Sequence, residues 1–168
     1  MCKTLIQTDE MQEYKSALAQ FPTGVAVVTC WNDDMQPLGM TINSFSSISL
    51  TPMLVSWCLD RRANSYVDFC LSKRFYISLL AQHQEDIATK FATRGINKFA
   101  DLLISDDNPI FIPESCAQFQ CIVVNKIGLG DHMMLVGEVE SFHWNDEDPL
   151  IYEQGKFTRS LNTTLKVA

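Results

Sequence analysis

Short apolar runs, many of them β-branched, recur along the chain and predict strands rather than long helices. The expected strands lie at residues 24–30, 38–47, 53–59, 74–80, 119–127, 132–144 and 150–152. Residues 128–131 separate the two longest runs and contain two glycines, which predicts a hairpin between them. Strands joined by such short turns are typical of an antiparallel sheet.

Three short helices are expected beside these strands. The first has Met11, Tyr14 and Leu18 at helical spacing, and the others begin near Ser65 and Gln84. Because strands do not alternate with long helices, a doubly wound parallel sheet is not expected. The pattern favours a mainly β fold, an antiparallel Greek-key barrel with a few short peripheral helices. We expect residues 1–168 to form a single domain.

The charge balance narrows the range of partners. The chain has 168 residues, of which 20 are Asp or Glu and 13 are Lys or Arg, so its formal net charge is −7. This charge repels nucleic acid phosphates and anionic lipid headgroups, so neither nucleic acid nor a membrane is an expected partner. The N-terminal segment becomes acidic before a signal-peptide core forms, and no apolar run reaches the roughly 18 residues of a spanning helix. We expect a cytoplasmic protein.

The six cysteines predict free thiols rather than a disulfide framework. Four lie in apolar segments, where a thiol behaves as a small hydrophobic side chain: Cys30, Cys58, Cys70 and Cys121. The sequence has no Cys-x-x-Cys motif, and its three histidines are scattered. No bound metal is therefore expected.

The segment from Thr41 to Thr51 has the most unusual composition in the chain. Seven of its eleven residues are Ser, Thr or Asn, and none is charged. A continuous strand would carry Thr41, Asn43, Phe45, Ser47 and Ser49 on one face and Ile42, Ser44, Ser46 and Ile48 on the other. Such a strand is suited to present hydroxyl, amide and backbone N–H groups to a flat heteroaromatic ligand with a polar tail. A solvated edge strand is the alternative interpretation.

Several motifs, in order along the chain, resemble the short-chain flavin reductase family. They are Phe21-Pro-Thr-Gly-Val25, Gly39-Met-Thr41, Ser44-Phe-Ser-Ser47, Gly130-Asp-His132, Val136-Gly-Glu-Val139 and Pro149-Leu150, followed by Tyr152, Gly155 and Phe157. The resemblance extends over nearly the whole chain, from about residue 14 to residue 157.

This resemblance implies a split β-barrel that binds FMN or FAD as a homodimer, with the flavin near the subunit interface. It implies hydride transfer from NADH or NADPH to the flavin, and release of the reduced flavin to a partner flavin-dependent monooxygenase. Because the chain has no Gly-x-Gly-x-x-Gly turn, the sequence does not choose between NADH and NADPH.

The resemblance also implies roles for individual residues. The expected flavin-binding residues are Thr41, Ile42, Asn43, Ser44, Phe45, Ser46, Ser47, Ser49, Asn64, Ser65, Ser78, Phe91 and Phe157. Among them, Ser46 and Ser47 are expected toward the phosphate end, together with the helix start at residues 64–65. His132 is the expected catalytic residue, beside the flavin where nicotinamide stacks. Phe91 and Phe157 also suit ordinary core packing, and an isolated histidine such as His132 also suits the start of a strand.

The chain departs from the family pattern at two positions. Met53 follows Pro52 where a second proline is common, and Ser78 stands where asparagine is common. The second change removes an amide beside the expected ring site, so the choice between FMN and FAD stays open.

Two other functions stay open. A non-enzymatic flavin-binding or electron-carrying protein would use the same barrel. A related split barrel that oxidises a pyridoxine phosphate would gather several Arg and Lys around the substrate phosphate, and the few basic residues of this chain are dispersed.

Overall fold

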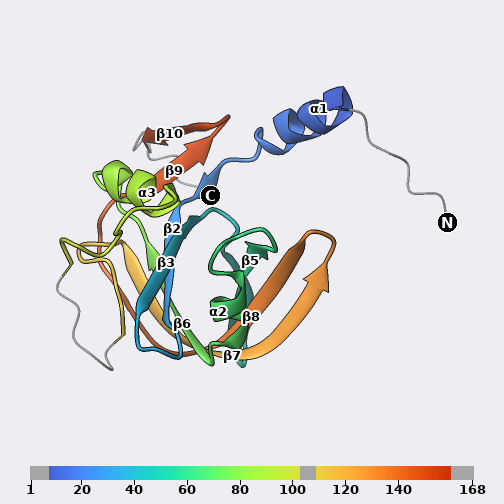
Figure 1. The fold of residues 1–168 in the computed structure, drawn as a ribbon. Coiled ribbons are helices and arrows are strands. Elements are labelled where there is room, and N and C mark those ends of the chain that lie inside the picture. The colour runs from blue at the N-terminus through green and yellow to red at the C-terminus, as the bar shows by residue number, and fades with distance from the viewer. Residues whose placement is uncertain (1–7, 103–108, 160–168) are drawn as a thin grey trace.

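The computed structural model describes residues 8–102 and 109–159 (Figure 1). In these ranges it contains three helices, α1 (Thr8–Leu18), α2 (Tyr66–Leu71) and α3 (Glu85–Ala92). All three lie where the sequence pattern predicts helices. In the same part of the chain, no helix is long and apolar enough to cross a membrane.

Seven antiparallel strands form the main sheet. In order across the sheet they are β3 (Pro37–Ile42), β2 (Ala26–Trp31), β6 (Arg74–Leu79), β7 (Ala117–Leu129), β8 (His132–Trp144), β5 (Met53–Asp60) and β4 (Ser46–Leu50). The two longest strands, β7 and β8, pair along their whole length and are joined at Gly130, whose φ is 56°. A positive φ suits glycine, so the predicted hairpin is confirmed.

The two edge strands of this sheet are neighbours in the sequence. β3 ends at Ile42 and β4 begins at Ser46, and four Cα–Cα steps cover at most about 15 Å. The sheet must therefore curl until its two edges approach each other, which gives the barrel in Figure 1. Among the described strand pairings, β3 does not pair with β4, so the barrel is split at this point.

A small second sheet lies beside α3 (Figure 1). It contains β1 (Thr23–Gly24), β9 (Leu150–Glu153) and β10 (Lys156–Arg159), with β9 in the centre. Val25 joins this sheet to the barrel, because its N–H donates to the Leu150 carbonyl (3.2 Å) and its carbonyl accepts from the N–H of Leu80 (2.9 Å).

The barrel interior is packed with aromatic and aliphatic side chains. Trp57 on β5 is fully buried and packs edge to face against Phe69 (5.1 Å between ring centroids) and Phe75 (6.0 Å). The five described cysteines are free thiols, as the sequence predicts. Burial raises the pKa of Cys30 and of Cys121 to about 12.

Two strand predictions are wrong in extent. The run at 38–47 is two strands, β3 and β4, separated by residues 43–45, because the chain there leaves one edge of the sheet and joins the other. The run at 24–30 is also divided, since β1 pairs with β9 whereas β2 pairs with β3 and β6. The strand β10 was not predicted. The division at 43–45 also ends the alternation expected between Thr41 and Ser49.

Candidate functional site

Two hollows lie along β3, the edge strand of the barrel. The loop hollow has a volume of about 500 Å³ and lies between β3, the start of α2 and residues 91–99. The hairpin hollow has a volume of about 600 Å³ and lies between the end of β3, α3 and the β9–β10 hairpin. Both hollows contain Thr41 and Ala92 in their walls, so together they form one groove along β3. Each volume lies within the range of small-molecule sites, about 300–1,000 Å³.

Gly39 allows two aromatic rings to close one wall of the loop hollow. A Cβ at this position would lie 2.7 Å from Cε1 of Phe91 and 3.0 Å from Cζ of Phe99. These rings pack edge to face with centroids 5.2 Å apart, and Phe91 is fully buried. Glycine is therefore required here for the close approach of the rings to the strand.

Thr41 connects β3 to α3 in the middle of the groove. Its Oγ1 donates a hydrogen bond to the carbonyl oxygen of Ala88 (2.6 Å). The bond orients the hydroxyl and commits its proton, so the lone pairs of Oγ1 remain available to accept from a ligand.

Lys98 places a positive charge in the wall of the loop hollow. Its Nζ donates to the carbonyl of Phe91 at the end of α3 (2.6 Å) and to the carbonyl of Gly39 on β3 (3.1 Å). The C-terminal carbonyls of a helix favour a cation, whereas partial burial lowers the pKa of Lys98. Arg94 and Asp68 lie in the same lining. The loop hollow therefore offers two cations against one carboxylate, which suits an anionic group.

The structure brings seven of the predicted flavin-binding residues into this groove. They are Thr41, Ile42 and Asn43 on and after β3, Asn64 and Ser65 before α2, Phe91 on α3 and Phe157 on β10. Phe91 is a buried core residue whose ring also reaches the hollow, so its position suits both predicted roles.

Three other predicted residues are engaged in contacts within the barrel. Ser44 Oγ accepts from the backbone N–H of Cys58 (3.0 Å), and Ser78 Oγ accepts from the N–H of Ile112 (3.0 Å). Phe45 packs against Phe119, with ring centroids 5.6 Å apart. None of these three side chains belongs to the lining of either hollow.

The remaining predicted flavin residues lie on β4, at the other edge of the sheet. Ser46 and Ser47 are exposed, and Ser49 Oγ accepts from the N–H of Thr51 (3.2 Å). None of the three belongs to the lining of either hollow. The contact with a flavin phosphate that is predicted for Ser46 and Ser47 lies outside this groove and stays a prediction.

His132 begins β8 and lies outside the lining of both hollows. It is paired across the sheet with Asp60 on β5. Its Nδ1 is 2.7 Å from Oδ1 of Asp131, and this hydrogen bond lowers the pKa of Asp131. The catalytic role expected for His132 therefore stays a prediction.

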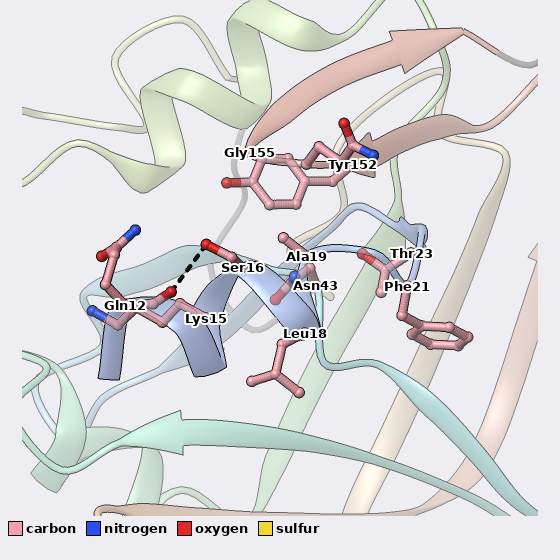
Figure 2. Close-up of a pocket in the computed structure, with 11 residues that line it drawn as sticks. Gln12, Lys15, Ser16, Leu18, Ala19, Phe21, Thr23, Asn43, Tyr152 and Gly155 are labelled. Carbon is pink, nitrogen blue, oxygen red and sulfur yellow. Dashed lines mark hydrogen bonds between the residues drawn. The ribbon is translucent and has the colours of Figure 1, made fainter. Parts of the chain in front are cut away.

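A third hollow opens between α1 and the β9–β10 turn and is shown in Figure 2. Its volume is about 450 Å³, and we call it the α1 hollow. It has Asn43, Tyr152 and Gly155 in common with the hairpin hollow. The groove along β3 therefore continues under α1.

Sequence reasoning did not identify Lys98, Arg94 or Tyr152 as site residues. Gly39 and Lys98 are 59 positions apart in the chain, and no local pattern connects a lysine to a distant strand edge. Among the described residues, no group of three or more His, Cys, Asp and Glu side chains is placed to hold a metal ion.

Comparison with known proteins gives a consistent result. A family model described as "Flavin reductase like domain" matches residues 18–160. The chain is 36% identical over 153 residues to the FMN reductase (NADH) SmoA of Agrobacterium fabrum, covering 90% of this chain and 87% of that protein. It is also 36% identical over 137 residues to the reductase component of the flavin-dependent trigonelline monooxygenase of Acinetobacter baylyi. That match covers 80% of this chain but 44% of the relative, so the chain spans less than half of that protein.

The fold comparison agrees with the sequence comparison. The structure is similar to the NADH:FAD oxidoreductase SgcE6 of Streptomyces globisporus, solved in complex with NAD and FAD fragments. The TM-score is 0.86 at 28% sequence identity, and the match covers 96% of this chain and 99% of that one. The split-barrel fold expected from the sequence is confirmed.

Proposed function

The chain belongs to the flavin reductase-like family, and on this basis we propose that it is an NAD(P)H-dependent flavin reductase. It transfers a hydride from a reduced nicotinamide nucleotide to FMN or FAD. The observation that supports this function most directly is the continuous groove along β3, which contains seven of the residues that the family resemblance assigns to flavin binding. NADH is the favoured donor, because the relatives SmoA and SgcE6 are named for it.

The charges of the groove orient the flavin within it. Lys98 and Arg94 lie in the loop hollow, so the phosphate end of the flavin binds there. Tyr152 and Phe157 lie in the hairpin hollow, with ring centroids 5.6 Å apart, and offer an aromatic wall to the isoalloxazine ring. Thr41 would hold the part of the flavin between these two ends, since the lone pairs of its Oγ1 are available to accept a hydrogen bond.

The protein itself supplies position rather than acid–base chemistry. When bound, a flavin would supply the ring that accepts the hydride from the reduced nicotinamide. The chain holds the two rings in contact and keeps the reacting atoms aligned. Asn43 lines both the hairpin hollow and the α1 hollow, so its side chain lies where the two hollows meet.

The oxidation of NADH and NADPH, followed at 340 nm with FMN, FAD or riboflavin added in turn, tests this function. We expect oxidation that increases with added flavin and that is faster with NADH. Flavin binding without oxidation of either nucleotide would instead support an electron carrier on the same barrel. If the protein neither oxidises a nicotinamide nucleotide nor binds flavin, the proposed function is contradicted altogether.

The partner is proposed to be a flavin-dependent monooxygenase, since the relative from Acinetobacter baylyi is named as the reductase component of one. Such a role requires that reduced flavin leaves the protein. Added cytochrome c, which free reduced flavin reduces, tests for this release under anaerobic conditions. Reduction of two cytochrome c molecules for each NADH oxidised is the expected result, and NADH oxidation without cytochrome reduction would contradict the role.

We also propose that the protein acts as a homodimer. Large apolar side chains are exposed on and after α1 and on β4, including Leu18 (56%), Phe21 (75%) and Leu50 (88%). Light scattering is expected to give twice the mass of one chain.

His132→Ala tests the catalytic prediction separately from dimer formation. We expect a lower kcat for NADH oxidation and an unchanged Kd for FMN, because the role concerns the nicotinamide rather than the flavin. An unchanged rate at saturating flavin would remove His132 from the mechanism.

A further inference from the structure

A buried glutamine joins three segments of the chain immediately before α3. Gln84 is 6% exposed, and its Oε1 accepts from the N–H of Ala81 in the turn after β6 (2.9 Å). Its Nε2 donates to the carbonyl of Pro113 (2.7 Å), and its backbone carbonyl accepts from the N–H of Ala88 in α3 (3.0 Å). A buried amide with both ends bonded inside the protein fixes the segments that it joins.

Pro113 belongs to a segment that is itself fixed to the barrel. We call residues 110–116 the strap. Gln118 at the start of β7 donates from its Nε2 to the carbonyl of Ile112 in the strap (2.8 Å), and the side chain of Ile112 is fully buried. The strap is therefore a firm support, and Gln84 connects the start of α3 to it.

The helix α3 carries this support to the groove. The carbonyl of Ala88, one turn after Gln84, accepts from Oγ1 of Thr41 (2.6 Å), so the position of the helix sets the direction of the hydroxyl proton. Lys98 holds the other end of the helix through the carbonyl of Phe91 (2.6 Å). Because α3 has only eight residues, a shift at its start would move the Ala88 carbonyl relative to β3.

We propose that Gln84 is a positioning residue for flavin binding, because by joining the strap to α3 it holds the Ala88 carbonyl where that carbonyl orients Thr41. The inference rests on the proposed function, since it takes the groove along β3 as the flavin site. Gln84 lies outside the linings of the loop, hairpin and α1 hollows. Its effect on the flavin is therefore exerted through the helix rather than by contact.

Gln84→Met tests this role, because the variant keeps the length of the side chain and removes its hydrogen-bonding ends. We expect the KM for FMN to rise about three- to tenfold, the equivalent of about one hydrogen bond, with little change in kcat at saturating FMN. Gln118→Met is the matched control, since Gln118 supports the same strap from β7 rather than from the start of α3. Both variants should lower the midpoint of denaturant unfolding. Equal KM values for FMN in the two variants would overturn the proposal.

A Thr41→Val background tests the route of the effect. In this background Gln84→Met should not raise the KM for FMN further, because the hydrogen bond that carries the effect is already absent. The midpoint of unfolding should still fall, since the contacts of Gln84 with Ala81 and Pro113 are lost in either background. A further rise in KM by the same factor would show that Gln84 does not act through Thr41 and would overturn the proposal.

Hydrogen exchange of the wild-type protein supplies a test that holds even where Gln84→Met fails to fold. Coupling between two sites is reciprocal, so FMN binding should slow the exchange of the Ala88 N–H, which donates to the carbonyl of Gln84. Unchanged exchange of this N–H in the protein saturated with FMN would overturn the inference. A wild type that oxidises no reduced nicotinamide with FMN or FAD would reject the proposed function, whereas an active wild type with these negative results would reject only this inference.

Discussion

The hydroxyl-rich segment from Thr41 to Ser49 divides into two halves that lie at opposite edges of the same sheet. In the first half, Thr41 and Asn43 line the groove, and Thr41 is bonded to α3. In the second half, Ser46 and Ser47 are exposed on β4, away from both hollows. Two stretches of similar composition thus have different surroundings. The difference arises at residues 43–45, where the chain passes from one edge to the other.

Ser44 lies between the two halves, and its side chain fixes the point where the chain crosses from one edge of the sheet to the other. Ser44 Oγ accepts from the N–H of Cys58 and donates to the carbonyl of the same residue (3.4 Å). The hydroxyl therefore takes the place of a strand neighbour for a residue of β5. A serine that looks suited to ligand binding in the sequence is used to anchor the crossing between the two edges.

The first half of the segment lines the groove, and we call it the groove half. Gly39→Ala should have the largest effect on its stability and on flavin binding. The added Cβ would lie 2.7 Å from Cε1 of the buried Phe91 ring, so the ring or the strand must shift. We expect the free energy of unfolding to fall by about 1–3 kcal/mol and the Kd for FMN to rise about tenfold, equivalent to about 1.4 kcal/mol. Denaturant unfolding and quenching of flavin fluorescence measure the two quantities. Gly24→Ala is the control, because a Cβ there has no atom within 4 Å, and an equal effect of both variants would exclude the steric explanation.

Thr41→Val and Ser44→Ala should separate binding from anchoring. Each loses a hydrogen bond of a partly buried hydroxyl, so we expect each to lower the free energy of unfolding by about 1 kcal/mol. Only Thr41→Val should raise the KM for FMN, since Oγ1 of Thr41 faces the groove and Oγ of Ser44 is bonded to Cys58. A raised KM in Ser44→Ala at unchanged stability would place Ser44 at the flavin.

Local patterns predicted most of the elements but not their connections across the barrel. The β-branched run 74–80 and the glycine-containing turn at 128–131 identify β6 and the β7–β8 hairpin without tertiary information. The break at residues 43–45 has only a mixed local signal, because Asn43 and Ser44 favour turns whereas Phe45 and the flanking Ile42 favour strands. The break itself is imposed by closure of the sheet. The division at Val25 has the same origin, since its neighbours Gly24 and Ala26 pair with strands of different sheets.

The site could be predicted only where its residues belong to motifs. Thr41, Asn43 and Phe157 were found through the family resemblance and do line the groove. Lys98 was missed, because its importance depends on contact with β3 and with the end of α3. Such long-range contacts leave no trace in one sequence.

The affinity for FMN should depend on pH through the charge of Lys98, which lies beside the groove half of the segment. Because burial lowers the pKa of Lys98 from the ordinary 10.5, its positive charge is lost at a lower pH than that of an exposed lysine. The affinity for FMN should therefore fall as the pH rises toward 10.5. The affinity for riboflavin, which has no phosphate, should not show this fall. A Lys98→Gln variant should bind FMN more weakly at neutral pH and lose the dependence, and a fall that persists in the variant would assign it to another group.

The double change Ser46→Ala with Ser47→Ala should have the smallest effect and is the sharpest test of the division between the halves. Both side chains are exposed on β4, so we expect the free energy of unfolding to change by less than about 0.5 kcal/mol. We also expect the Kd values for FMN and riboflavin to stay the same, because the proposed function places the phosphate at the cations of the loop hollow. A Kd that rises for FMN but not for riboflavin would move the phosphate end to β4. The two halves of the segment would then serve one ligand from opposite edges of the split barrel.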